Sequence, residues 1–349
     1  MPRLAFAVPG GLEARTGGTI YGRKLVETLR ADGWWVDVLV WPGSFPFPNE
    51  GERLEAAASL AALPDNSLVL IDGLALGTLP GLARKEMNRL RLAALVHHPL
   101  ALETGLSPMM AATFAMEERD ALRCVQAVVV TSQTTAAILE GAFDAPAELI
   151  TVATPGVDKP SAPRGPRAPG PLRIFAMGSI SPRKAHHVLV EALSRIENLN
   201  WACVIAGNLK SDPETAEALI EQIALLGLQD RVRLIGEVSA GQAEQLYAQS
   251  DIFALASVYE GYGMVFSEAL AHGLPIVATT GGAIPEVVPP EAGVLVEPGN
   301  AKAFADALGG LIQSPERLAR LAAGSGAAGA VLTGWDVTAA IVASALDRL

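Results

Sequence analysis

Short apolar runs alternate with helical patterns along the second half of the chain, and this alternation restricts the possible folds more than any other feature. The predicted strands are residues 172–177, 201–206, 232–235, 252–256, 275–279 and 293–296. Strands separated by helices form βαβ units and pair in parallel, with helices covering the sheet. The first half begins in the same way, with a run at 4–8 and a helix that starts near Ile20 after an N-cap at Thr19. The sequence therefore predicts an α/β protein with a parallel sheet in each half.

A segment rich in proline and glycine separates the two halves. Residues 158–171 read DKPSAPRGPRAPGP, in which seven of fourteen residues are Pro or Gly. Such a composition is typical of an interdomain linker. We therefore expect one α/β domain over 1–157 and a second over 172–330, with a cleft between them. Ligands of open α/β sheets bind beyond the carboxyl ends of the strands, so the loops after the strands are the expected places for a site.

The composition of the 349 residues excludes several classes of protein. Hydrophobic residues make up 50% and charged residues 18%, which indicates a globular chain. The net charge of -11 opposes sequence-independent binding to nucleic acid or to an anionic membrane. The longest uncharged stretch, residues 269–285, contains a histidine, glycines and prolines and does not predict a transmembrane helix. No signal-peptide pattern follows Met1, so the expected location is the cytoplasm.

The two cysteines give no sign of a metal site. Cys124 and Cys203 lie in apolar surroundings, without a CxxC pair or a neighbouring group of histidines. Metal-binding thiols come in such clusters. The sequence also lacks a DxD-like pair of carboxylates. We therefore predict two buried free thiols and no bound metal.

A glycine-rich loop after the fourth strand of the second half carries the most informative motif. Glu260 lies in this loop, and Gly261 and Gly263 allow the backbone to approach a ligand closely. A helical pattern follows at 264–272, with Glu268 about one turn inside it. A strand, a glycine loop and a helix N-terminus form a common phosphate site, and carboxylates beside it would accept hydrogen bonds from neutral hydroxyls. On spacing alone, a helix cap at Glu260 and a solvated Glu268 fit equally well.

The spacing within this region matches a known signature at Ser257, Glu260, Gly261, Gly263, Glu268, Ala269, Gly273 and Pro275. The pattern resembles the two-glutamate signature of the retaining, nucleotide-sugar-dependent family-4 glycosyltransferases. Further segments fit that family in the same order: GGT at 17–19, LVHHPL at 95–100, TPGVD at 154–158, MGSISPRKAHHVLVEAL at 177–193, GGAIPEVV at 281–288 and VLVEPGN at 294–300. The resemblance implies the GT-B fold, in which two Rossmann-like domains, here 1–157 and 172–330, face each other across a deep cleft. It also implies that the final segment, 331–349, is a helix that crosses back toward the first domain.

The resemblance assigns the donor to the second domain. It implies that Glu268 holds the ribose hydroxyls of the nucleotide, that Glu260 lies against the donor sugar, and that amides of the following helix meet the diphosphate. The implied donor-binding residues are Glu268, Gly261, Gly263, Met264, Val265, Gly178, Ser179 and Gly207. This division is physically coherent, because carboxylates accept hydrogen bonds from hydroxyls and the positive end of a helix attracts phosphate.

The loop after the first strand of the second domain would supply positive charge to the leaving group. Lys184 matches the family's lysine, and a cation there would stabilise the charge that grows on the departing diphosphate. The family's usual arginine falls on Ser179, which departs from the pattern. Two alternatives stay open: Arg183 supplies the second positive charge, or Lys184 acts alone. For Arg183, a solvated Arg-Lys pair on a loop is the structural alternative.

The sequence contains two pairs of adjacent histidines. His97 and His98 come directly after the run 92–96, and the resemblance implies a histidine there near the donor sugar and the acceptor. We favour His97 over His98 as the catalytic residue. His186 and His187 lie about one turn into the first helix of the second domain, at positions that vary in the family, and we do not expect them to bind ligand.

Four further residues of the first domain are candidates for the acceptor side. Gly18 and Thr19 open the first helix, where a tight turn and a helix cap explain them nearly as well. Asp72 and Glu103 follow strand-like segments, and their carboxylates are candidates for recognising acceptor hydroxyls.

Together these observations predict a hexosyltransferase that moves a sugar from a UDP- or GDP-sugar to a hydroxyl of a glycan, lipid or small molecule. The resemblance implies retention of the anomeric configuration and independence of metal and of any further cofactor. The expected catalytic residues are Glu260, Lys184, His97 and Arg183.

Three alternative functions have features in common with this sequence. A sugar-nucleotide epimerase or phosphorylase would share the fold, and a non-catalytic two-lobed nucleotide-sugar-binding protein would share the cleft. A nicotinamide-dependent oxidoreductase is disfavoured, because neither first loop of the two domains contains the GxGxxG fingerprint.

Overall fold

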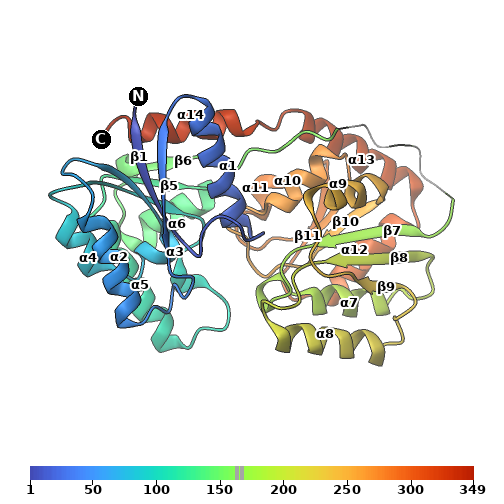
Figure 1. The fold of residues 1–349 in the computed structure, drawn as a ribbon. Helices are drawn as coiled ribbons and strands as arrows, with labels where there is room; N and C mark the ends of the chain where they lie inside the picture. The colour runs from blue at the N-terminus through green and yellow to red at the C-terminus, as the bar shows by residue number, and fades with distance from the viewer. Residues whose placement is uncertain (162–164, 166–168) are drawn as a thin grey trace. The chain divides into compact units, whose positions relative to one another are not determined.

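The computed structural model describes all residues except 162–164 and 166–168. Both of these segments belong to the predicted linker 158–171, and that part of the prediction lies outside the described residues. The described chain divides into two compact units (Figure 1), each of which contains one sheet of six parallel strands. The first unit consists of Met1–Gly156 and Thr333–Leu349, and the second of Val157–Leu332.

The sheet of the first unit has the strand order β2-β1-β3-β4-β5-β6. Its strands are β1 (Arg3–Pro9), β2 (Trp35–Trp41), β3 (Leu68–Asp72), β4 (Arg91–Val96), β5 (Ala127–Val130) and β6 (Ile150–Val152). Because all pairs are parallel, the carboxyl ends of the strands lie at one edge of the sheet. The direction of the strand order reverses between β1 and β3, and a reversal of this kind is where open α/β sheets bind ligands.

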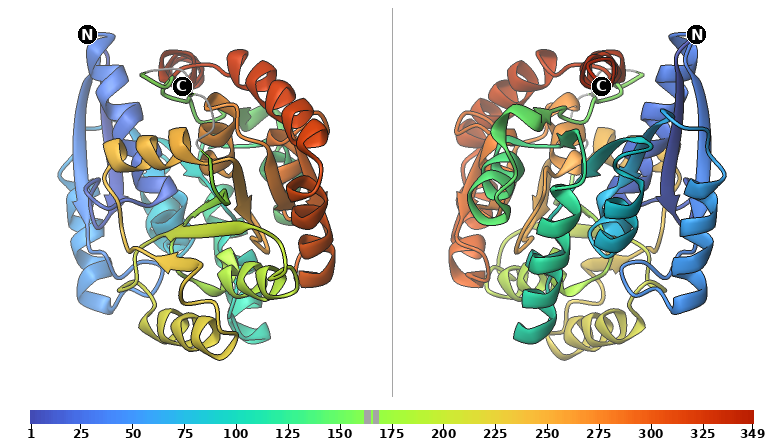
Figure 2. Two further views of the ribbon diagram at one scale, coloured as in Figure 1. Left: turned by 90° about the vertical axis from the view of Figure 1, so that its right-hand side faces the viewer. Right: turned by 90° about the vertical axis from the view of Figure 1, so that its left-hand side faces the viewer.

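Helices cover both faces of the first sheet. They are α1 (Gly17–Ala31), α2 (Glu50–Ala61), α3 (Gly73–Leu76), α4 (Pro80–Glu86), η1 (Leu100–Leu102), α5 (Pro108–Leu122), α6 (Gln133–Phe143), η2 (Ala147–Leu149) and α14 (Trp335–Leu346). Alternate strand residues such as Ile71 and Val128 pack against α2, α5 and α6. On the other face, α14 lies beside α1 and against β5 and β6 (Figures 1 and 2).

The C-terminal helix α14 is fastened to the first unit by specific contacts. The ring of Trp335 meets the ring of Tyr21 edge to face, with centroids 5.5 Å apart. The Thr338 hydroxyl donates to the Thr154 carbonyl at 2.8 Å. Gly156 packs so closely on the backbone at Trp335 that a methyl group would overlap it. The last 17 residues of the unit are therefore part of its fold rather than an appendage.

The sheet of the second unit has the order β12-β11-β10-β7-β8-β9, the arrangement of a dinucleotide-binding fold. Its strands are β7 (Leu172–Met177), β8 (Trp201–Ala206), β9 (Val232–Leu234), β10 (Ile252–Leu255), β11 (Ile276–Thr279) and β12 (Gly293–Val296). All six were predicted from sequence, three of them with the same bounds. The strand order reverses between β7 and β10.

Two apolar layers enclose this second sheet. Its helical elements are η3 (Pro182–Lys184), α7 (His186–Ser194), α8 (Pro213–Leu225), α9 (Ala240–Gln249), α10 (Met264–Ala271), α11 (Ile284–Val287), α12 (Ala301–Ile312) and α13 (Pro315–Ala330). Ile174 and Ala254 face α7, α8 and α12, whereas their neighbours Phe175 and Phe253 face α9 and α10. In Figure 1, α7 and α8 lie below β7 and β8, and α9 and α10 lie above them.

Two predictions of helix starts were wrong. The first helix begins at Gly17, and its N-cap is Thr16, not Thr19. Thr19 is the third helical residue and exchanges hydrogen bonds with Thr16 in a capping box, which compensates for two glycines in the first turn. His186 and His187 open α7 instead of lying one turn inside it, because η3 ends just before them.

The cysteine prediction was correct: Cys124 and Cys203 are buried and free. Among the described residues, no single helix has both the length and the hydropathy of a membrane span, although α13 and α14 together meet these criteria as a bent pair.

Candidate active site

Two loops of the second unit meet where its strand order reverses. One joins β7 to η3 and α7 and carries Gly178, Arg183 and Lys184; the other joins β10 to α10 and carries Glu260. The loops are tied together by their backbones, since the Val258 amide donates to the Arg183 carbonyl at 2.8 Å. The predicted cations and the predicted first glutamate thus come together at the carboxyl ends of β7 and β10.

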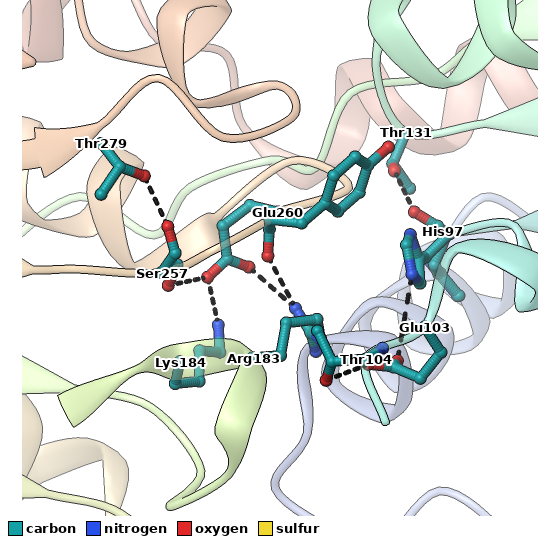
Figure 3. A network of polar contacts seen from close by, with 11 residues as sticks. His97, Glu103, Thr104, Thr131, Arg183, Lys184, Ser257, Glu260 and Thr279 are labelled. Atoms are coloured by element: carbon teal, nitrogen blue, oxygen red, sulfur yellow. Dashed lines mark hydrogen bonds and ion pairs between the residues drawn. The ribbon is translucent and has the colours of Figure 1, made fainter. Parts of the chain in front are cut away.

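Glu260 is the centre of a buried network of polar contacts (Figure 3). The side chain is almost fully buried, with 4% of the residue exposed. Its Oε1 accepts hydrogen bonds from Lys184 Nζ at 2.6 Å and from Ser257 Oγ at 2.6 Å. Its Oε2 lies 3.4 Å from Arg183 Nη1, which also donates to the Tyr259 carbonyl at 3.1 Å. The carboxylate is therefore paired with two cations.

Charge pairing outweighs burial in setting the ionisation of Glu260. Burial alone would raise the pKa of this carboxyl, but Lys184, Arg183 and the hydroxyl of Ser257 lower it below its usual value. Glu260 is consequently ionised at neutral pH, and the two cations are held in fixed positions. Neither sequence alternative fits this geometry: the N-cap of α10 is Gly263 rather than Glu260, and the Arg-Lys pair is not solvated.

The backbone beside Glu260 is held by the end of β11 and by the segment that follows it. The Thr279 hydroxyl donates to the Ser257 carbonyl at 2.5 Å, and the Ala283 amide donates to the Glu260 carbonyl at 2.9 Å. Gly282 forms an isolated parallel bridge with Glu260 and has a φ of +63°, a conformation suited to glycine. The GGAIPEVV segment thus has a structural explanation: its glycines allow the chain to pass directly against the loop of Glu260.

The N-terminus of α10 follows the same loop. Gly263 is its N-cap, with a φ of +95°, and no side chain caps the helix. The first amides of a helix lack partners within the helix, so those at Met264 and Val265 are available to a ligand in the way a phosphate requires. Gly261 lies two residues before Gly263 in the chain and is buried.

Close glycine packing shapes the other loop. A methyl group on Gly207, which follows β8, would overlap the carbonyl oxygen of Gly178. A methyl group on Gly178 would lie 3.2 Å from Cδ of Lys184, so the lysine stem lies along the Gly178 backbone. Ser179 is the next residue of this loop and is partly exposed. Gly207 therefore contributes close packing under the lysine.

Glu268 projects from α10 and is partly buried. Its Oε2 accepts a hydrogen bond from the hydroxyl of Tyr247 on α9 at 2.8 Å. The alternative of a solvated Glu268 is therefore wrong. Burial raises the pKa of this carboxyl to about 7, and the nearby Asp158 adds to the rise, whereas the Tyr247 hydroxyl opposes it.

His97 and Asp72 form a pair in the first unit, at the carboxyl ends of β4 and β3. His97 Nε2 lies 3.8 Å from Asp72 Oδ2, and the ring packs edge to face on Tyr21 at a centroid distance of 5.2 Å. A methyl group on Gly18 would lie 3.3 Å from the imidazole, so glycine leaves room for the ring. Burial lowers the pKa of His97 and raises that of Asp72, which favours the neutral imidazole. Asp72 also caps α3 by accepting from the Leu74 amide.

Thr19, His98 and Glu103 occupy less central positions in this unit. The Thr19 hydroxyl donates to the Ala14 carbonyl at 2.7 Å and is committed to the start of α1. His98 Nε2 lies 3.9 Å from Glu103 Oε2, and Glu103 Oε1 accepts from the Thr104 amide at 2.9 Å. Glu103 and Thr104 are labelled in Figure 3.

Glu118 is a buried carboxyl that holds the segment after His97. It lies on α5, is 2% exposed, and accepts the Leu100 amide at 3.0 Å through Oε2. Its Oε1 makes no hydrogen bond with any described residue. Burial raises the pKa of Glu118 to about 8, although the amides of Leu100 and Ala101 oppose the rise. The side chain therefore carries a proton at neutral pH.

This proton makes stability depend on pH. The carboxyl loses its proton near pH 4.5 in the unfolded chain and near 8 in the folded one, so the folded state binds more protons between these values and its stability falls as pH rises. Glu118→Gln cannot ionise at this position. We therefore expect the difference in unfolding free energy between this variant and the wild type to shift in favour of the variant by roughly 2 kcal/mol between pH 6 and pH 8. Urea denaturation at both pH values measures this, with Glu117→Gln as the control on the same helix. Parallel pH dependence in wild type and Glu118→Gln would contradict the assignment.

The structure brings the predicted residues together within each unit. It also shows further residues that hold them in place through contacts that the sequence did not reveal. The additional residues are Ser257, Tyr247, Thr279 and Gly282 in the second unit and Tyr21, Glu118 and Trp335 in the first. No three His, Cys, Asp or Glu side chains among the described residues cluster closely enough to hold a metal ion. Of these supports, only Ser257 and Gly282 lie within recognised motifs; Tyr247 and Glu118 occupy ordinary helical positions in the sequence.

Comparison with known protein structures supports the fold. Sucrose-phosphate synthase from Thermosynechococcus elongatus superposes with a TM-score of 0.85 at 20% identity, over 100% of this chain and 99% of that one. HepE from Anabaena, in a structure described as a complex with UDP-glucose, gives a TM-score of 0.79 at 21% identity over the whole of both chains. These likenesses are in fold alone, and they agree with the predicted GT-B architecture.

Sequence comparison identifies the family. Residues 159–325 match the family model described as glycosyl transferases group 1. An MMP alpha-(1->4)-mannosyltransferase from Mycolicibacterium hassiacum is 30% identical over 298 residues, which cover 80% of this chain and 70% of that protein. A D-inositol 3-phosphate glycosyltransferase from Xylanimonas cellulosilytica is 36% identical over 171 residues, but the match spans only 40% of its length. On the strength of the match to the mannosyltransferase, this chain belongs to the group 1 glycosyl transferases.

Proposed function

We propose that this protein transfers a hexosyl group from a UDP- or GDP-sugar to an acceptor hydroxyl with retention of anomeric configuration. The observation that carries the proposal is the buried Glu260, paired with Lys184 and Arg183 at the carboxyl ends of β7 and β10. An ionised carboxylate beside two fixed cations suits a ligand that has hydroxyls next to a diphosphate. The names of the relatives, a mannosyltransferase and inositol phosphate glycosyltransferases, support a hexosyl group.

In the proposed reaction the bond between the anomeric carbon and the diphosphate oxygen breaks as the acceptor oxygen bonds to the same face of the sugar. The acceptor proton passes to the departing phosphate oxygen. Negative charge grows on the leaving group, and Lys184, Arg183 and the N-terminus of α10 would stabilise it because they are already oriented. Arg183 would take the place of the family's arginine, which is absent at Ser179. No metal is needed in this scheme, since these groups supply the positive charge.

The remaining residues take supporting roles in the proposal. Glu268 would accept the ribose hydroxyls of the donor. His97, neutral and oriented by Asp72, would contact the sugar or the acceptor, and the acceptor would lie mainly on the first unit. Its chemical class stays as expected from the sequence, a glycan, lipid or small molecule with a free hydroxyl, and the expected location stays the cytoplasm.

Glu268→Ala tests the donor site. Because the carboxylate would accept two hydroxyls, and hydrogen bonds to a charged group contribute roughly 1.5 to 3 kcal/mol each, we expect nucleotide affinity to fall by at least about 150-fold. Calorimetric titration with UDP and GDP measures this, and Glu221→Ala, at an exposed position on α8, is the matched control. Unchanged affinity in Glu268→Ala would rule out the ribose assignment.

A panel of UDP- and GDP-sugars tests the activity itself. A donor present at 100 times its dissociation constant adds about 2.7 kcal/mol to stability, which a thermal shift detects. We expect one donor to raise the melting temperature and to be hydrolysed slowly without acceptor. A complete lack of binding across the panel would contradict the proposed function.

A further inference from the structure

Tyr247 is held rigidly in the core of the second unit. It lies on α9, is 2% exposed, and its ring meets Phe175 edge to face at a centroid distance of 5.0 Å. The ring also stacks on His272 at a centroid distance of 5.0 Å with an interplanar angle of 20°. Phe253 contacts it as well, at 5.6 Å. These contacts fix the direction in which the hydroxyl points.

The fixed hydroxyl has one proton and two neighbouring acceptors. It lies 2.8 Å from Glu268 Oε2 and 3.1 Å from the Val265 carbonyl. An ionised carboxylate is the stronger acceptor of the two and forms the shorter bond. Among the described residues no group bonds to Oε1 of Glu268, so the second oxygen is left for a ligand. Tyr247 therefore orients Glu268 and leaves half of its carboxylate available.

The charged groups around Glu268 oppose its ionisation. Asp158, at the start of the second unit, raises the pKa of Glu268, and burial raises it further, to about 7. His272, the C-cap of α10, directs Nδ1 at the Glu268 carbonyl at 2.8 Å rather than at the carboxylate. Glu244 on α9 acts electrostatically with His272 and accepts the Ser161 amide at 2.7 Å. Of these groups, the Tyr247 hydroxyl is the one that lowers the pKa of Glu268.

We propose that Tyr247 is a positioning residue that keeps Glu268 ionised for the ribose hydroxyls, so that nucleotide affinity rises with pH through neutrality. This inference rests on the proposed function, in which Glu268 binds the ribose. The ionised carboxylate accepts hydrogen bonds at both oxygens, whereas the protonated form uses one oxygen as a donor. Removing the hydroxyl of Tyr247 while keeping its ring should therefore raise the pKa of Glu268. Nucleotide binding should weaken most in the pH range where Glu268 is protonated in the variant and ionised in the wild type.

The test is UDP and GDP affinity from pH 5.5 to 9 for the wild type, Tyr247→Phe and Glu268→Gln. We expect the wild-type affinity to rise through about pH 7. In Tyr247→Phe the midpoint should move up by about one unit, so that affinity is about 5-fold lower at pH 7 and approaches the wild-type value at pH 9. Glu268→Gln should lack this titration, and its remaining pH dependence reports the phosphate of the nucleotide, which is common to all variants.

The outcomes separate positioning from packing and from the proposed function. A pH profile of Tyr247→Phe that coincides with the wild type overturns the inference, and so does a uniform loss at all pH values, which a merely structural role would produce. Nucleotide affinity of Glu268→Gln equal to the wild type would instead contradict the ribose assignment. Tyr21→Phe is the matched control, since it removes a buried hydroxyl that donates to the Ala153 carbonyl in the first unit. We expect it to leave the midpoint unchanged.

Discussion

Replacing Lys184 by alanine should lower turnover by a factor of roughly a hundred to a thousand, the usual effect of removing one oriented group that stabilises charge in the transition state. The same change should also lower stability by about 3 kcal/mol, because Glu260 would remain buried with Arg183 at 3.4 Å as its nearest cation. Steady-state kinetics with the identified donor measures the first effect, and urea denaturation measures the second.

A double variant separates these two effects of Lys184. In the double variant Lys184→Ala/Glu260→Gln the buried carboxylate that lost its lysine is replaced by a neutral amide. The free energy of unfolding should therefore recover, while turnover stays low. Lys302→Ala, which removes a similar but exposed ion pair with Asp306, is the control and should change neither quantity appreciably. Turnover close to wild type in Lys184→Ala would exclude a role of this lysine in stabilising the leaving group.

Replacing Gly207 by alanine should destabilise the second unit by more than about 3 kcal/mol. The added methyl group would overlap the Gly178 carbonyl, which is backbone and cannot turn aside as a side chain would. The loop after β7 must then move, and Lys184 moves with it because its stem lies along Gly178. We expect a lower urea midpoint and weaker donor binding together.

Gly241→Ala is the matched control for this change. Gly241 lies on the exposed first turn of α9, and no atom lies within 4 Å of the position of its added methyl group. Alanine there should stabilise the protein by up to about 1 kcal/mol. If Gly207→Ala unfolded at the same urea concentration as the wild type, the conclusion that Gly207 packs tightly against the Gly178 carbonyl would be contradicted.

The second unit could be predicted well because its strands are covered on both faces. Such strands are apolar at every position and end in loops that carry recognisable motifs. The motifs also revealed Glu260 and Lys184 individually. Their pairing could not be predicted, since the two residues are 76 positions apart and only the strand order of the sheet brings their loops together.

The first unit was harder to predict because some of its helices reverse the usual pattern. On α5, Met109 is 80% exposed and Met116 is 61% exposed, while Glu118 is 2% exposed. A periodicity analysis assigns such a helix the wrong buried face. The start of α1 was predicted three residues too late because Gly17 and Gly18 are poor helix formers. A glycine is suited to position 18 because the His97 ring packs against it.

The fastening of α14 to the first unit affects the order in which the protein can fold during synthesis. Tyr21 is made before the second unit, but Trp335, which packs against its ring, is made only after the whole second unit. Until then the face of α1 that α14 covers is bare, and the ring that supports His97 lacks one of its neighbours. The unit whose synthesis starts first is therefore completed after the second unit, and its histidine acquires full support only when α14 has been made.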